Sequence, residues 1–171
     1  MIELEKNRRE SQLLDTIQNN PGIQFRQIMR KSGLKNGVLS HYLGKLEKIG
    51  LIKVEREPRQ TRYYSPRITH EEYKVIKALR RQTPRDLLLA LVKKDGLEFS
   101  QLRMETGKAP STVSFYLSQI LEDSLVEIRI QNLKKKYYLK TQNTINRLIE
   151  QYRPSLIEGP TSRFEDIFNS L

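Results

Sequence analysis

Apolar positions recur at helical spacing three times within the first 50 residues, and each recurrence predicts an amphipathic helix. The first helix is expected over about 6–19 and is ended by Pro21-Gly22. A short second helix follows, and Gly33 supplies a tight reversal into a third helix that ends near Gly50. The inward stripes of these helices are Leu13, Leu14 and Ile17; Phe25, Ile28 and Met29; and Leu39, Leu43 and Leu46.

Beyond Gly50 the apolar spacing changes from helical to alternating, which is typical of β-strands. The stretch 51–56 is rich in β-branched residues, Pro58-Arg59-Gln60 predicts a turn, and 61–64 returns as a second strand. We therefore expect a protruding hairpin, or wing, after the third helix.

The whole pattern occurs again 74 residues further along the chain. Aligning 13–65 with 87–139 without a gap gives 12 identities in 53 pairs, where roughly three or four would arise by chance in a comparison of this kind. The identical pairs include Gly22 with Gly96, Phe25 with Phe99, Gly33 with Gly107, Ser40 with Ser114, and Tyr63-Tyr64 with Tyr137-Tyr138. The predicted fold class is mainly α with small β-hairpins (α+β), as two winged helix-turn-helix domains in tandem plus C-terminal helices.

The expected domains are residues 1–68 and 84–140, joined by a linker helix over 69–83 and followed by a helical tail over 141–171. Apolar stripes mark the linker helix at Tyr73, Ile76 and Leu79, a tail helix at Ile145, Leu148, Ile149 and Tyr152, and a last helix at Phe164, Ile167, Phe168 and Leu171. Apolar stripes of this kind must be buried against other apolar side chains. Either they fold back on the same chain, or they form a homodimer through 69–82 or 144–171.

The stretch from Gly33 to Ile52, GLKNGVLSHYLGKLEKIGLI, resembles the helix-turn-helix of winged-helix transcription regulators, the broad group that contains the MarR-like and ArsR-like families. It is especially similar to archaeal regulators that carry two such modules in one chain. The resemblance covers 13–139 and implies DNA binding, transcription regulation and, as is usual for the class, a dimer. The fold also serves protein–protein contacts, so it is less specific for function than for architecture.

The amino-acid composition indicates which classes of molecule the protein can bind. There are 31 Lys and Arg against 20 Asp and Glu, a net charge of +11, which favours polyanionic partners but also suits ribosome-associated proteins or anionic membrane surfaces. Cysteine is absent, which excludes disulfides and thiolate chemistry. The longest apolar run, 87–92, has six residues, whereas a bilayer-spanning helix needs about 20. We expect a cytoplasmic, nucleoid-associated protein.

A helix that enters the major groove of DNA needs short polar side chains and cations on its outward face. In the first repeat, three polar residues suit base edges, three lysines suit phosphates, and three arginines surround the turn of the wing. These are Asn36, Ser40 and His41; Lys35, Lys45 and Lys48; and Arg56, Arg59 and Arg62.

The second repeat has fewer cations at the corresponding positions. Glu122 stands where the first repeat has Lys48, and Phe115 suits either a thymine methyl group or a protein partner. The remaining candidates for DNA contacts are Lys108, Ser111, Thr112, Ser114, Gln119, Lys134, Lys135 and Lys136.

No sequence signature of catalysis is found: the chain has no phosphate-binding glycine loop and no Gly-x-Ser-x-Gly elbow. His41 and His70 lack the neighbouring ligands that a metal site requires. The sequence therefore predicts a non-enzymatic, double-stranded DNA-binding transcription regulator without cofactor or metal. A protein–protein adaptor and a nonspecific chromatin- or RNA-associated protein remain the alternatives.

Overall fold

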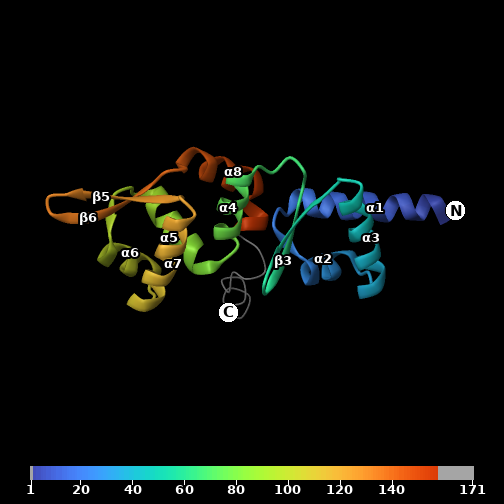
Figure 1. Cartoon of the computed structure of the whole chain (residues 1–171), viewed down its shortest axis with the longest axis horizontal. Helices are drawn as coiled ribbons and strands as arrows, with labels where there is room; N and C mark the ends of the chain where they lie inside the picture. The colour runs from blue at the N-terminus through green and yellow to red at the C-terminus, as the bar shows by residue number, and fades with distance from the viewer. Residues whose placement is uncertain (1, 158–171) are drawn as a thin grey trace, which may run out of the picture. The chain divides into compact units, whose positions relative to one another are not determined.

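The chain divides into two compact units, one up to His70 and one from Glu71 onwards (Figure 1). The computed structural model describes residues 2–157. The helix predicted from Phe164 to Leu171 lies outside the described residues. None of the described helices is both long and apolar enough to cross a membrane.

Unit 1 contains three helices and a three-stranded antiparallel sheet of order β1-β3-β2. Its elements are α1 (Ile2–Asn19), β1 (Ile23–Gln24), α2 (Phe25–Ser32), α3 (Asn36–Lys48), β2 (Lys53–Glu57) and β3 (Gln60–Tyr64). The three helices and the hairpin were predicted, but β1 was not. Two residues carry no periodic signal, and β1 exists only because Ile23 pairs with Tyr63 and Gln24 with Arg62.

The core of unit 1 confirms the helical stripes that the sequence predicts. Leu13, Ile17 and Ile28 are buried together with Leu39, Leu43 and Leu46. Gly33 makes the reversal between α2 and α3 at φ 69°, and its N–H donates to the Met29 carbonyl at 3.0 Å. This turn fixes α3 against the core by one face and leaves its other face outside.

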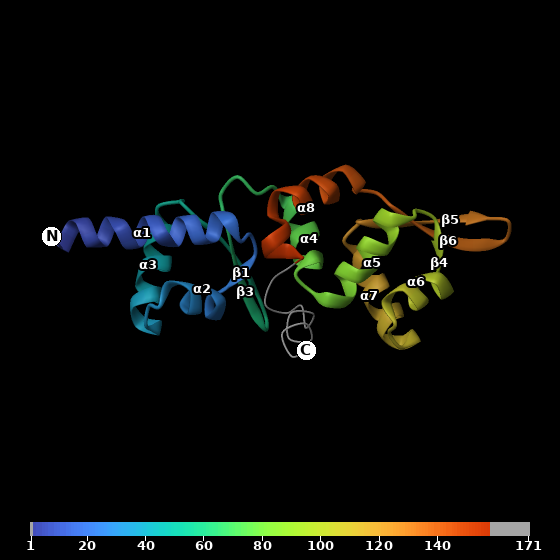
Figure 2. The ribbon, with the colours of Figure 1, turned by 180° about the vertical axis from the view of Figure 1, so that it is seen from behind.

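Unit 2 repeats this order and adds a helix at each end (Figure 2). Its elements are α4 (His70–Leu79), α5 (Gln82–Lys93), β4 (Leu97–Glu98), α6 (Phe99–Thr106), α7 (Pro110–Glu122), β5 (Val126–Gln131), β6 (Lys134–Leu139) and α8 (Gln142–Leu156). The sheet order is β4-β6-β5. Leu97 pairs with Tyr137, and Ile128 with Tyr137; these registers repeat those of Ile23 and Val54 with Tyr63 at the offset of 74.

The apolar stripes of the added helices α4 and α8 are buried within the same chain. Ile76, Leu79, Ile145 and Leu148 are all buried within the chain, and Arg147 of α8 pairs with Glu72 of α4 at 2.8 Å. Of the two covers expected for these stripes, folding back on the same chain is the one observed for 70–157. α8 is interrupted near its end: Tyr152 has non-helical angles, and two helical stretches meet there at a kink close to Pro154.

Gly96 provides a test of this packing. It has φ +75°, and a Cβ there would lie 2.8 Å from the Tyr138 ring, whereas Gly50 has φ +76° and nothing within 4 Å. Both substitutions to alanine should cost about 1–2 kcal/mol of unfolding free energy from backbone strain, and Gly96→Ala should cost more than Gly50→Ala because the Tyr138 ring must move away from the new Cβ. Urea denaturation of both variants measures the difference, and equal losses would contradict the close approach of Tyr138.

Candidate nucleic-acid interface

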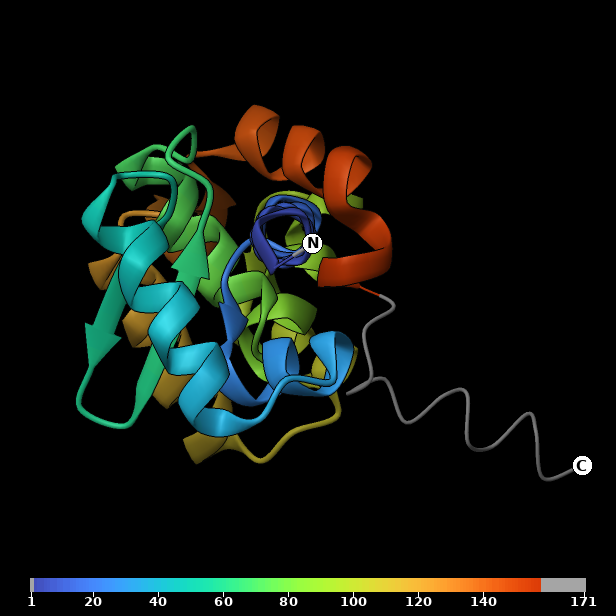
Figure 3. The same ribbon diagram turned by 90° about the vertical axis from the view of Figure 1, so that its right-hand side faces the viewer.

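The outward face of α3 is small and polar (Figure 3 shows α3 beside the β2–β3 hairpin). Leu39, Tyr42, Leu43 and Leu46 hold the helix to the core. The residues left exposed on and before the helix include Lys35, Asn36, Gly37, Ser40, His41, Gly44 and Lys48. The two glycines keep side-chain bulk off this face, so a flat surface such as a base-pair edge could approach the backbone closely.

Several of these side chains already have partners within unit 1. The Ser40 hydroxyl donates to the Asn36 side-chain oxygen at 3.3 Å, and the His41 ring meets Tyr42 edge-on at 5.8 Å between centroids. Lys45 forms an ion pair with Glu10 of α1. The charge of Lys45 is therefore partly neutralised, which the sequence did not predict because Glu10 lies 35 residues away.

A groove of about 320 Å³ separates α3 from the hairpin. Its walls include Ser40, Gly44 and Glu47 from the helix and Arg56 and Tyr63 from the strands. Arg56 donates two hydrogen bonds of 2.7 Å to the two carboxylate oxygens of Glu47. This bidentate pair ties the wing to the helix across the groove.

The same pair shifts the titration of both groups. The hydrogen bonds from Arg56 lower the pKa of Glu47, against a smaller opposing effect of burial. The pairing in turn raises the pKa of Arg56, and burial raises the pKa of Tyr63 in the same groove. At neutral pH the groove therefore holds a charged pair beside a neutral phenol.

The wing carries two exposed arginines, Arg56 and Arg59, not three. The expectation that Arg62 is a DNA-binding arginine at the turn of the wing is wrong. Arg62 is 5% exposed, and its guanidinium donates at 2.8 Å to the Gly22 carbonyl and to the Gln60 side-chain oxygen. It lies inside unit 1 because residue 62 pairs with Gln24 on the central strand of the sheet. Arg62 joins strands and is removed from the candidate interface.

Unit 2 presents a different face on α7. Ser111 and Ser114 are exposed, while Thr112 and Lys108 are half-buried. Phe115, at the position of His41, is 56% exposed. Because no Lys or Arg lies within α7, its outward face is neutral apart from Glu122.

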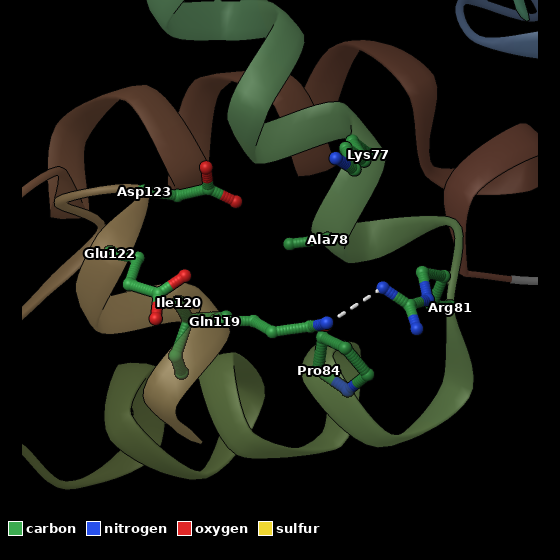
Figure 4. Close-up of a pocket in the computed structure, with 8 residues that line it drawn as sticks. All are labelled: Lys77, Ala78, Arg81, Pro84, Gln119, Ile120, Glu122 and Asp123. Atoms are coloured by element: carbon green, nitrogen blue, oxygen red, sulfur yellow. Dashed lines mark hydrogen bonds between the residues drawn. The ribbon is translucent and has the colours of Figure 1, made fainter. Parts of the chain in front are cut away.

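Gln119 faces a small hollow of about 140 Å³ in unit 2, shown in Figure 4. Its side-chain oxygen accepts a hydrogen bond of 2.9 Å from Arg81, and Arg81 also stacks over the Tyr116 ring at 4.8 Å. Glu122 and Asp123 line the same hollow. Gln119 therefore contributes to the packing of α7 on the corner between α4 and α5. Its side chain is not free to contact a base.

The wing of unit 2 carries three lysines, but it has no arginine at the positions of Arg56 and Arg59. Lys134 pairs with Glu98 at 3.2 Å, Lys135 is exposed and Lys136 is half-buried. At the positions of Arg56 and Arg59 stand Ile130 and Leu133, which are 71% and 99% exposed.

Comparison with known proteins identifies part of the chain. Residues 6–53 match the family model described as winged helix-turn-helix DNA-binding. This part of unit 1 is therefore similar to a winged helix-turn-helix. No curated protein matches the sequence.

Solved structures similar to the chain include regulators from three bacteria. A MarR-family transcriptional regulator from Silicibacter pomeroyi is 23% identical, with a TM-score of 0.40, over 58% of this chain and 75% of that one. BpsR from Bordetella bronchiseptica, whose DNA binding is regulated by 6-hydroxynicotinic acid, is 14% identical, with a TM-score of 0.38, over 58% and 85%. The PcaV regulator from Streptomyces coelicolor is 15% identical, with a TM-score of 0.34, over 80% and 91%. These TM-scores are too low to carry a functional conclusion.

The pair across the groove predicts a pH response. Since the folded-state pKa of Glu47 lies below its ordinary value of 4.5, the stabilisation from the pair is present above that value and is lost as the pH falls through the folded-state pKa. Arg56→Gln should raise the pKa of Glu47, whereas Arg59→Gln should not. NMR titration of the Glu47 side-chain carboxyl carbon measures both, and equal midpoints in the parent and in Arg56→Gln would contradict the pairing.

The buried position of Arg62 predicts a cost in stability. Arg62→Gln removes the donors to the buried Gly22 carbonyl and to the half-buried Gln60 side chain, and should lower the unfolding free energy by about 1–3 kcal/mol. Arg59→Gln, at an exposed position of the same hairpin, should change stability little. Thermal denaturation of the two variants tests this; equal melting temperatures would mean that the two hydrogen bonds contribute nothing measurable.

Proposed function

We propose that the protein is a double-stranded DNA-binding transcription regulator. The helix over 35–48 enters the major groove, with Asn36, Ser40 and His41 at base edges and Lys35 and Lys48 at phosphates. Arg56 and Arg59 of the wing bind phosphates or the minor groove. A winged helix-turn-helix is typical of regulatory rather than enzymatic proteins.

One observation carries this proposal: an exposed polar α3, inside the segment 6–53 that matches a DNA-binding family model, lies beside an exposed wing that bears Arg56 and Arg59. A net charge of +11 supports a polyanionic partner. The Arg56–Glu47 pair limits how strongly the wing attracts phosphate, because Arg56 must exchange one anion for another. Arg59, which has no carboxylate partner within residues 2–157, is the stronger phosphate ligand.

Unit 2 is proposed as a second winged helix in tandem, from the repeated strand order and register. Its exposed serines Ser111 and Ser114 and its wing lysines Lys134, Lys135 and Lys136 can add phosphate contacts. Glu122 opposes them, and α7 offers no cation. We infer that unit 1 reads sequence and that unit 2 adds affinity.

The exposed Phe115, Ile130 and Leu133 favour a second role for unit 2 in protein contacts. This agrees with the adaptor alternative for that unit, while the polar face of α3 supports DNA as the partner of unit 1. The nonspecific alternative predicts equal affinity for all duplexes.

Selection of bound duplexes from a random pool, with variants beside the parent, tests the function. Arg59→Gln should weaken binding to all duplexes alike and reduce the slope of log affinity against log salt by about 1. His41→Ala should instead change the preferred sequence. Fluorescence anisotropy at several salt concentrations measures both effects.

Arg67→Gln is the matched control, because it removes an exposed cation outside α3 and the hairpin. It should leave the sequence preference unchanged and weaken binding less than Arg59→Gln. Equal losses on every duplex from Arg59→Gln and His41→Ala would favour the nonspecific alternative. A protein that fails to retain any duplex at low salt would exclude the proposal.

A further inference from the structure

β5 is the outermost strand of the sheet in unit 2, whose order is β4-β6-β5. The Lys140 N–H donates to the Leu125 carbonyl at 3.0 Å, and backbone groups alternate between the two sides of an antiparallel strand. The N–H and C=O groups of Ile128 and Ile130 therefore point away from β6. Within the described chain no strand pairs with this edge.

The side chains along this edge are apolar on one face. Ile128 is 43% exposed and Ile130 is 71% exposed, and Val126 precedes them on the same face at 2%. An exposed edge strand with alternating isoleucines is a template for pairing with another strand.

The corresponding edge strand of unit 1 lacks this property. β2 has the sequence KVERE, with Arg56 at the position of Ile130 and Arg59 at the position of Leu133. Charged side chains on an edge strand oppose strand pairing. The apolar edge is therefore specific to unit 2 and is not a consequence of the fold.

We propose that two copies of the chain associate through β5, which pairs antiparallel with β5 of the second copy around a two-fold axis at Arg129. Ile128 of each copy then lies opposite Ile130 of the other. The outward backbone groups of both isoleucines are hydrogen-bonded, and the isoleucine side chains of the two copies cover one another.

The exposure of the strand selects this register. Side chains that lie opposite each other in an antiparallel pair are on the same face of the sheet, and side chains alternate between the faces along each strand. When the two strands are identical, the two-fold axis must therefore pass through a residue and not between two residues. We centre the pairing on Arg129 because the two exposed isoleucines then lie opposite each other, whereas the side chain of Val126 is already covered.

The surroundings of Arg129 permit that centre. Its guanidinium lies over the Tyr138 ring of its own sheet at 4.4 Å, and its Nε donates to Glu127 at 2.6 Å. The charge is therefore held back from the edge and neutralised, which limits repulsion between the two arginines. The lysines of β6 lie on the neighbouring strand and stay outside the pairing.

A ladder this short buries less surface than a permanent dimer requires, so we expect association that depends on concentration. Two copies bound on one duplex would raise their effective concentration. The association itself does not depend on the proposed function.

Sedimentation equilibrium of the full chain tests the proposal. Ile130→Lys introduces a charge on the edge and should weaken association at least about tenfold. Ile49→Lys is the matched control, since Ile49 is 54% exposed in unit 1, and it should leave association unchanged. A parent chain that stays monomeric up to millimolar concentration, or equal weakening by both variants, would overturn the proposal.

Single cysteines test the register, because the chain has none of its own. Opposed residues of a pair without hydrogen bonds lie about 4.5 Å apart at Cα, within the range of a disulfide. Arg129→Cys should form a disulfide-linked dimer about tenfold faster than Ile128→Cys or Ile130→Cys alone. A mixture of the last two should also cross-link, and equal rates for all three single variants would contradict the register.

Duplex binding separates this proposal from the proposed function. Ile130→Lys should still bind DNA through unit 1, with the loss confined to association between copies. If Arg129→Cys fails to cross-link while the parent chain binds duplex, the pairing is wrong and the DNA-binding proposal stands. If the chain cross-links at Arg129→Cys but retains no duplex, the pairing stands without the function.

Discussion

Burial of one stripe of α3 is the interaction on which the candidate site depends. Leu39, Leu43 and Leu46 pack in one core with Leu13 and Ile28. Truncating a buried leucine of this kind to alanine typically costs about 2–5 kcal/mol, so rotation of the helix about its axis is strongly opposed. Because the buried face is fixed, the opposite face is fixed too, and the small polar residues of α3 must lie outside. Which side chains of α3 are exposed is therefore set by the packing of the leucines on its opposite face.

The two units show how one core can support different surfaces. Buried pairs are kept at the offset of 74, as with Leu43 and Leu117, while outward positions diverge, as with His41 and Phe115. Core positions are constrained by volume and close contact, whereas exposed positions are constrained only by what they bind. The first unit presents polar and cationic groups, and the second presents serines and aliphatic side chains. The fold is therefore kept in both units while their outward surfaces differ.

Ion pairs within unit 1 modify the charge that a polyanion would meet. Lys45 and Arg56 are matched to Glu10 and Glu47, so the cations on this face are fewer than a count of Lys and Arg indicates. Exposed pairs of this kind contribute little to stability. Their effect is on positioning, since the Glu47 carboxylate orients Arg56 across the groove, and on the cost of exchanging that carboxylate for a phosphate.

The sequence by itself determined the helices, the hairpins, the repeat and the outward face of α3, because these depend on periodicity and on turn residues that act locally. It did not determine β1, the burial of Arg62 or the partners of Lys45 and Arg56. The Arg62 contact to Gly22 spans 40 residues, and the Lys45 contact to Glu10 spans 35. Whether a side chain in an alternating strand is covered depends on what packs against that strand. Only the tertiary structure decided which cations face solvent and which strand edge is left open.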